Sequence, residues 1–189
     1  MKVLDFLRKS PEKTAALGLY RTCVAQARRP GFYREQGVPD TVDGRFDMIA
    51  IHVFLALYRL KQDRPRTVGL AQELFDLMFA DMDQNLRELG VGDLAVGRRI
   101  KKMTSAFQGR IVAYETALTA PPETSRSALM AALKRNLFRH CEPAPEILAA
   151  IAGYIDTQAG ILSRQSVDEL MQGTITFGGD LPLALQSAP

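Results

Sequence analysis

The chain has 189 residues, of which 47% are hydrophobic and 24% charged, the balance of an ordinary soluble globular protein. A formal net charge of +3 is too small to indicate a nucleic-acid-binding protein by itself. The length predicts a single domain with its own core. Cys23 and Cys141 lie far apart in the sequence and predict reduced thiols in a cytosolic protein, with one disulfide as the alternative.

Helix signals begin near the N-terminus. A capping serine followed by a proline, Ser10–Pro11, predicts the start of a first helix, which must end before Pro30. Residues 29–44 are rich in proline and glycine and predict an ordered loop.

A second helix is predicted from about residue 45 to residue 61. It is apolar on nearly all sides, apart from one stripe of Arg45, His52 and Arg59 at spacings of seven residues. A helix of this kind is usually central in its fold.

Two longer helices are predicted next. Thr67 is a candidate cap for a helix that reaches about residue 88, and Asp93 is a candidate cap for a helix that reaches residue 118. The turn between them, GVGD, contains two of the chain's glycines. In the later helix, apolar residues recur at steps of three and four, which is typical of one buried face: Ile100, Met103, Phe107, Ile111, Tyr114 and Leu118.

The remaining sequence completes an all-α prediction. A loop with the sequence TAPPETS offers Thr124 or Ser125 as a cap. Further helices are predicted at about 126–139, 145–161 and 166–172. The predicted fold is a single-domain irregular bundle of about six to eight helices over residues 1–172, followed by an extended or partly disordered tail, 173–189.

The stretch FADMDQNLRELGVGD, residues 79–93, alternates acidic residues like the beginning of a calcium loop. A loop of that type that began at Asp81 would need glycine at its sixth position and glutamate at its twelfth. The chain has Leu86 and Gly92 there. Both requirements fail, so the pattern does not support a calcium site.

A helical interpretation of the same stretch is better supported. Apolar residues fall on one narrow stripe at 100° per residue, namely Phe75, Met78, Phe79, Met82, Leu86 and Leu89. Asp83 and Arg87 then lie one turn apart, the acid before the base, which favours an ion pair. Gly90 is expected to end this helix.

No residue set in the sequence predicts an enzyme. The chain has only two histidines, His52 and His140, and the adjacent His140 and Cys141 have no further metal ligands at a suitable spacing. There is neither a phosphate-binding loop nor a nucleophile elbow. We therefore predict no catalytic residues, no metal site and no cofactor.

The sequence GRRIKKM contains the most unusual charges in the chain. It places Arg98, Arg99, Lys101 and Lys102 in the first turns of a helix, where positive charge opposes the helix dipole at a cost of about 0.3–1 kcal/mol each. We expect these bases to form an exposed basic face with Arg110. The face is either a solvated surface, paired with acids such as Asp83, or a binding surface for an acidic protein, RNA or lipid headgroups.

Residues 31–61 and 74–103 resemble the ubiquinol–cytochrome c chaperone family, and the similarity extends roughly from residue 10 to residue 172. The acidic stretch FADMDQNLRELGVGD followed directly by the basic helix start carries most of this resemblance. The resemblance implies an all-helical assembly factor for the cytochrome bc1 complex that acts by binding and not as an enzyme. It implies cytochrome b or other bc1 subunits as partners; the ribosome and a membrane surface remain open as further partners.

The residues that match the motif or continue its basic helix are the predicted partner-binding residues: Asp81, Asp83, Asn85, Gly92, Asp93, Arg98, Arg99, Lys101, Lys102 and Arg110. The alternative function is a basic module that binds a ribosome or RNA. Such a module would bind its partner less tightly as the salt concentration rises.

The predicted location is the cytoplasm, with the inner membrane as a surface that the protein contacts peripherally. The longest apolar run, residues 48–58, is shorter than the roughly 20 residues that a membrane-spanning helix needs. The N-terminal segment KVLDFLRK is amphipathic and offers a second candidate for membrane contact.

Overall fold

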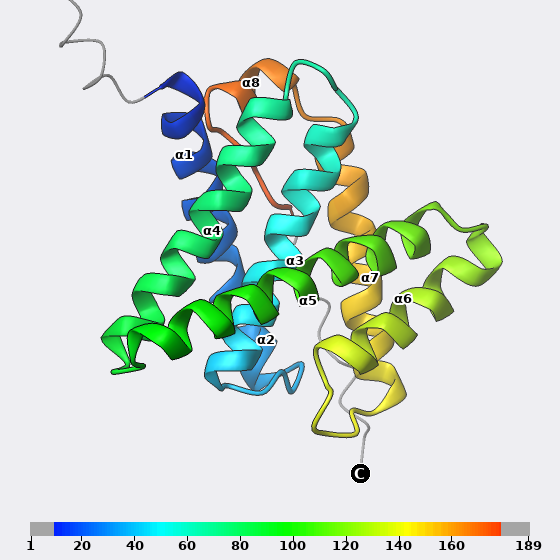
Figure 1. Cartoon of the computed structure of the whole chain (residues 1–189). Coiled ribbons are helices and arrows are strands. Elements are labelled where there is room, and N and C mark those ends of the chain that lie inside the picture. Colours follow the sequence, from blue (N-terminus) through cyan, green and yellow to red (C-terminus); the bar gives the residue numbers. More distant parts are fainter. Residues whose placement is uncertain (1–9, 179–189) are drawn as a thin grey trace, which may run out of the picture.

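The structure is a computed structural model that describes residues 10–178 (Figure 1). These residues form eight helices and no strand, which confirms the all-α prediction. The helices are α1 (Pro11–Ala27), α2 (Pro30–Arg34), α3 (Val42–Lys61), α4 (Val68–Glu88), α5 (Asp93–Thr119), α6 (Pro122–Asn136), α7 (Pro145–Ser163) and α8 (Val167–Met171). None of the helices in the described part of the chain has the length and hydrophobicity needed to span a bilayer.

Helix α3 is the centre of the fold, as its sequence predicts. It contacts α1, α4, α5 and α7, and it is buried along most of its length (Figure 1). Of the predicted polar stripe only Arg45 is exposed; His52 and Arg59 are both buried. The guanidinium of Arg59 donates to the carbonyl of Gln165 at 2.6 Å and forms an ion pair with Asp63.

Prolines start two helices at positions that the sequence analysis placed in loops. Pro30 opens the short helix α2 inside the predicted loop 29–44, and α6 begins at Pro122, four residues before the predicted start. The first turn of a helix tolerates proline because the backbone N–H groups there have no partner within the helix. The predicted caps at Thr124 and Ser125 are therefore wrong.

The first turn of α3 packs tightly against the loop before it. The hydroxyl of Thr41 accepts a hydrogen bond from the amide of Gly44 at 3.1 Å, so the helix starts three residues earlier than predicted. A Cβ atom on Gly44 would lie 2.0 Å from the carbonyl oxygen of Pro39. Only glycine fits this approach.

Two of the predicted caps form other contacts. Thr67 is the residue before α4, but its hydroxyl donates to the carbonyl of Leu60 at 2.6 Å and does not cap the helix. The N-cap of α5 is Gly92, and Asp93 is the first helical residue without a capping hydrogen bond. Both helices nevertheless begin within one residue of the predicted positions.

The chain after α8 returns to the core as an extended segment. Ile175 is buried, and the side-chain amide of Gln158 exchanges two hydrogen bonds with the backbone of Gly178. The described residues 173–178 of the predicted tail therefore pack against the helices. The rest of that tail, 179–189, and the amphipathic segment at residues 2–9 lie outside the described residues.

A buried polar chain joins α1, α3 and α7 beneath this segment. Nδ1 of His52 lies 2.8 Å from the carbonyl of Met48 and must donate to it, because a carbonyl can only accept. Nε2 of the neutral ring therefore accepts from the hydroxyl of Tyr154 at 2.8 Å. The amide of Gln26 donates to that hydroxyl at 3.0 Å. Burial lowers the pKa of His52 to about 4. His52 is thus a neutral core residue and not a metal ligand.

The neutral state of His52 makes stability depend on pH. Its pKa is about 4 in the folded protein against 6.5 for the free group, so the unfolded chain binds the extra proton between these values. The stabilising contribution is complete above pH 6.5 and is lost as the pH falls. Relative to His52→Gln, the wild-type free energy of unfolding should decrease by about 1.4 kcal/mol between pH 7.5 and pH 5.5. Urea titrations at both pH values test this; parallel pH profiles would contradict it.

Candidate partner-binding site

The acidic stretch lies at the end of α4, where it forms a hairpin with α5. Its predicted apolar stripe is confirmed for Met78, Phe79, Met82 and Leu86, which are all buried. Met78 and Met82 therefore fill the core. Leu89 departs from the prediction, because it is 62% exposed at the tip of the hairpin.

The hairpin turn has the geometry expected of a glycine-terminated helix. Gly90 has a φ of 78°, and its amide donates to the carbonyl of Arg87 at 2.9 Å. The amide of Val91 donates to the carbonyl of Leu86 at 3.1 Å. These two bonds satisfy the last carbonyls of α4 and confirm that Gly90 ends the helix.

The first acid of the motif holds α4 against α1. The hydroxyl of Tyr20 donates to Oδ2 of Asp81 at 2.7 Å, and burial together with this bond raises the pKa of Tyr20. The side-chain amide of Asn85 donates to the backbone carbonyl of Asp81 at 2.6 Å. Asp81 and Asn85 therefore have partners inside the domain.

Two further acids of the motif, Asp83 and Asp93, share one arginine. Nε of Arg87 lies 2.5 Å from Asp83, as the one-turn spacing predicts, and Nη1 lies 2.5 Å from Asp93 across the turn. Arg87 thus joins the end of α4 to the start of α5. It also occupies the acids that were candidate counter-charges for the basic helix start.

The four bases at the start of α5 remain without an ion-pair partner among the described residues. Arg98, Arg99, Lys101 and Lys102 are all exposed. Leu94, four residues before Arg98 and seven before Lys101, lies on the same helix face and is 86% exposed. The structure therefore brings four of the predicted site residues together on one open surface beside two exposed leucines, Leu89 and Leu94.

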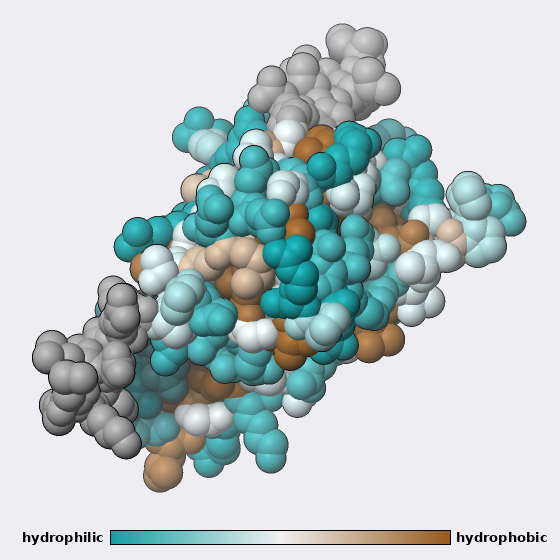
Figure 2. All heavy atoms as spheres, turned by 90° about the horizontal axis from the view of Figure 1, so that it is seen from above, coloured by the Kyte–Doolittle hydropathy of each residue, from teal (hydrophilic) through white to brown (hydrophobic). Residues whose placement is uncertain are grey.

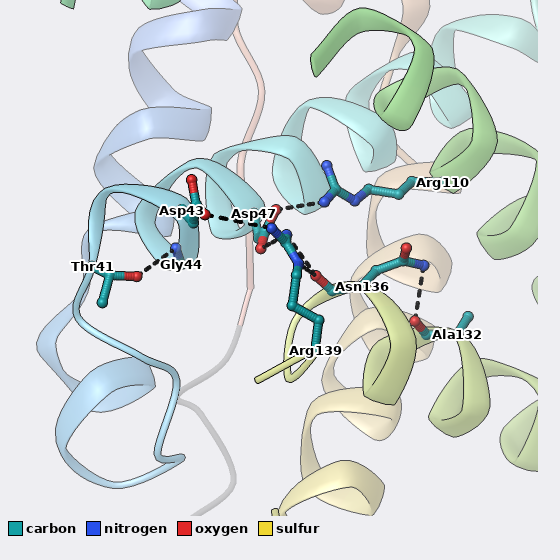
Figure 3. A network of polar contacts seen from close by, with 8 residues as sticks. All are labelled: Thr41, Asp43, Gly44, Asp47, Arg110, Ala132, Asn136 and Arg139. Atoms are coloured by element: carbon teal, nitrogen blue, oxygen red, sulfur yellow. Dashed lines mark hydrogen bonds and ion pairs between the residues drawn. The ribbon is translucent and has the colours of Figure 1, made fainter. Parts of the chain in front are cut away.

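Arg110 does not belong to this surface, and its predicted exposed position is wrong. The residue is 6% exposed, and its Nη2 lies 2.8 Å from Oδ1 of Asp47 on α3 (Figure 3). Its guanidinium also lies 5.5 Å from the centre of the Phe46 ring. The spacing contained this information, because Arg110 follows Phe107 by three residues and therefore shares the buried face of α5.

Asp47 is the centre of a buried charge network that the sequence analysis missed. Besides Arg110, it pairs with Arg139, whose Nη1 lies 3.7 Å from Asp43 (Figure 3). Burial raises the pKa of Asp47 to about 6, although both arginines act in the opposite direction. The network fixes α3, α5 and the segment after α6 relative to one another. It adjoins a pocket of 410 Å³ that is also lined by Val42 and His140.

A groove is lined by the C-terminal half of α3 together with residues of α4 and α5. Figure 1 shows how α4 and α5 diverge from their hairpin. The volume of the groove is 270 Å³. The apolar lining residues are Phe54, Leu57, Tyr58, Ala71 and Ile111, and the charged ones are Lys61, Arg64 and Glu115. Lys61 and Glu115 form an ion pair. We call this the α3–α4–α5 groove; its apolar residues could not be told from core residues in the sequence.

Possible metal ligands do not gather at one place in the described part of the chain. It holds no group of three or more histidine, cysteine or acidic side chains arranged to bind a metal ion. Cys23 is buried and Cys141 exposed, and both are free thiols, as predicted. The candidate site has two parts, a basic hairpin at one end of α5 and an apolar groove nearer the other end.

Comparison with known proteins relates these features to a family. Residues 34–177 match the model of the ubiquinol-cytochrome C chaperone family, and this range runs from the end of α2 to the extended segment. The crystal structure of a Cbp3 homologue from Brucella abortus superposes with a TM-score of 0.79 and 38% identity, covering 95% of this chain and 97% of that one.

Curated relatives carry the name ubiquinol-cytochrome c reductase complex assembly factor 1. The Xenopus laevis protein is 26% identical over 84% of this chain and 78% of its own length. The human protein is 28% identical over 87% of this chain, but the match spans only 54% of its length; for the mouse protein this share is 52%. Since the family model covers most of the chain, the chain belongs to the ubiquinol-cytochrome c chaperone family.

Proposed function

We propose that this chain is an assembly factor of the cytochrome bc1 complex that binds cytochrome b, or an assembly intermediate that contains it, without covalent chemistry. The observation that carries the proposal is the family match over residues 34–177, which includes both the basic hairpin and the groove. The names of the curated relatives support the same role. The site of action in this proposal is the cytoplasmic face of the inner membrane.

The α3–α4–α5 groove is the docking site that we propose for the client. Cytochrome b is a membrane subunit, so before assembly it exposes apolar helices that need shielding from water. A groove with apolar walls and charged residues at its rim can receive one apolar helix face and its polar flank. Lys61, Arg64 and Glu115 provide such a rim.

The ten predicted partner-binding residues divide into two groups in this proposal. Arg98, Arg99, Lys101 and Lys102 are free to contact an acidic partner. The other six build the fold: Asp81, Asp83, Asn85, Gly92, Asp93 and Arg110. Substitutions in the second group would therefore act first on stability.

Deletion of the gene in its native host tests the proposed function. Assembled cytochrome b should decrease strongly while its transcript stays at the wild-type level, because the client lacks its binding partner after synthesis. Haem spectra of membranes and native gels measure the assembled complex. Normal amounts of bc1 complex in the deletion strain would refute the proposal.

Physical association is tested by affinity purification in mild detergent. Tagged protein should recover cytochrome b from the host, and recovery should rise in a strain that cannot complete the bc1 complex, because intermediates accumulate there. A different integral membrane protein of similar abundance serves as the control. Equal recovery of both proteins would contradict specific client binding.

A further inference from the structure

The tip of the α4–α5 hairpin combines two features that no part of the fold requires. Leu89 and Leu94 lie on either side of the turn and are 62% and 86% exposed. Four bases follow on the next two turns of α5, and none has an ion-pair partner among the described residues. Figure 1 shows this tip at the edge of the molecule, away from α6 and α7.

We propose that the hairpin tip is a membrane-contact site for anionic lipid: the leucines insert between headgroups while Arg98, Arg99, Lys101 and Lys102 bind phosphate groups. Leu94, Arg98 and Lys101 share one helix face. From Leu94 to Lys102 the helix rises by roughly 12 Å, so the exposed leucine and the four bases lie within about two turns of one another. Long basic side chains can keep their charge in that layer while their stems contact apolar surface.

The acids near the tip do not cancel these charges. Asp83 and Asp93 are both paired with Arg87, on the side of α4 and the turn. Glu88 accepts a hydrogen bond from Gln84 at 2.7 Å and remains the one further acid of the hairpin end. The bases of α5 therefore face outward with their charge available, as an anionic surface requires.

Lipid fits this surface better than RNA does. Single-stranded RNA is held by bases stacked on aromatic side chains as well as by positive charge. Residues 93–102 contain no aromatic residue, whereas they contain an almost fully exposed leucine. Exposed leucines beside lysines and arginines are the usual combination of a peripheral membrane-binding segment.

The rest of the visible surface differs from the hairpin tip. In the view from above, the molecule is covered mainly by hydrophilic residues, with separate hydrophobic patches between them (Figure 2). Val112 is a further exposed apolar residue on the outer face of α5, but it lies far along the helix from the four bases. Within residues 10–178, the tip is the place where exposed leucines and bases without an ion-pair partner coincide.

Vesicle co-sedimentation of the full chain tests the inference. Vesicles of phosphatidylcholine with phosphatidylglycerol should bind the wild-type protein, and vesicles of phosphatidylcholine alone should bind it far less. Each base contributes roughly a factor of five near an anionic surface, so changing all four to glutamine should lower the partition coefficient by roughly 600-fold. Leu89→Ser with Leu94→Ser should lower it by on the order of a hundredfold, because two apolar side chains no longer insert.

A matched control separates local charge from net charge. Changing Lys13, Arg21, Arg28 and Arg34 to glutamine removes the same number of exposed bases from α1, the residue that follows it, and α2. This variant should retain most of the binding. Equal loss in both quadruple variants would overturn the proposal, and so would wild-type vesicle binding after removal of the four hairpin bases.

Two further outcomes are decisive. Tight binding to a single-stranded RNA oligonucleotide without binding to anionic vesicles would overturn the lipid proposal in favour of RNA. The serine variant distinguishes insertion from simple charge attraction: unchanged vesicle binding after Leu89→Ser and Leu94→Ser would overturn the insertion step. The assay contains no bc1 subunit, so its failure would leave the proposed assembly function standing.

Discussion

Replacement of Arg110 by methionine should lower the free energy of unfolding by about 3 kcal/mol at pH 8, because it leaves the buried carboxylate of Asp47 with only one arginine. The deficit should be clearly smaller at pH 5. There the carboxyl of Asp47 is mostly protonated even in the wild type, since its pKa is about 6. Urea denaturation of both proteins across this pH range measures the difference.

The direction of this pH dependence follows from the linkage between proton binding and folding. A carboxyl whose pKa is raised from 3.8 to about 6 on folding contributes stability that is complete below pH 3.8 and is lost as the pH rises through 6. Without Arg110 the pKa of Asp47 rises further. The free energy of unfolding of the variant therefore continues to fall up to a higher pH than that of the wild type. The pH dependence of His52 is common to both proteins and cancels in the comparison.

Two control variants test whether the buried ion pair causes this loss of stability. Arg45→Met removes an exposed arginine of α3 that is paired with Asp40 at 2.6 Å, and it should leave the unfolding free energy close to the wild-type value, because solvent screens an exposed ion pair. The double variant Asp47→Leu with Arg110→Met replaces the buried pair by apolar side chains and should recover most of the lost stability. A double variant as unstable as the sum of the single variants would contradict the ion-pair explanation.

The case of Arg110 also illustrates what the sequence could and could not predict. The periodicity that identified α5 places Phe107, Arg110 and Tyr114 on one face, and all three are buried. The pattern was therefore sufficient to place Arg110 inside. Its partner Asp47 could not be found in this way, because an acid within an apolar helix has no local sign of which distant base it meets.

The ends of the helices were also predicted only in part. Gly90 was correctly identified as the end of α4, since a glycine with positive φ is a local requirement of that turn. Asp93 and Thr67 were wrongly assigned as caps, because each side chain found a stronger partner elsewhere: Arg87 for Asp93 and the carbonyl of Leu60 for Thr67. Tertiary contacts decided both.

The groove is the part of the candidate site that sequence reasoning missed altogether. Ile111 was predicted as part of the apolar stripe of α5, and it does pack against the core. Its further contribution to an open groove depends on the angle at which α4 leaves α5 and on the position of α3 beneath. No residue type records such an angle, so core and groove look alike in the sequence.

Blocking the groove should abolish client binding if cytochrome b docks there. Ala71→Phe fills it from the side of α4, and Ile111→Glu places a charge in its apolar wall. Loss of a central apolar contact typically costs more than 1.4 kcal/mol, so each variant should lower the cytochrome b recovered in detergent by about tenfold or more. Quantitative immunoblots of the purified fractions measure this recovery.

The matched controls carry the same substitutions outside the groove. Val112→Glu changes the neighbouring residue of α5, which is 65% exposed, and Ala106→Phe adds a ring on its exposed face. Both should retain client binding. Urea denaturation shows whether Ile111→Glu remains folded, and Ala71→Phe tests the groove without a buried charge. If the folded Ala71→Phe protein recovers as much cytochrome b as the wild type, the groove is not the docking site. The client would then have to bind a different surface.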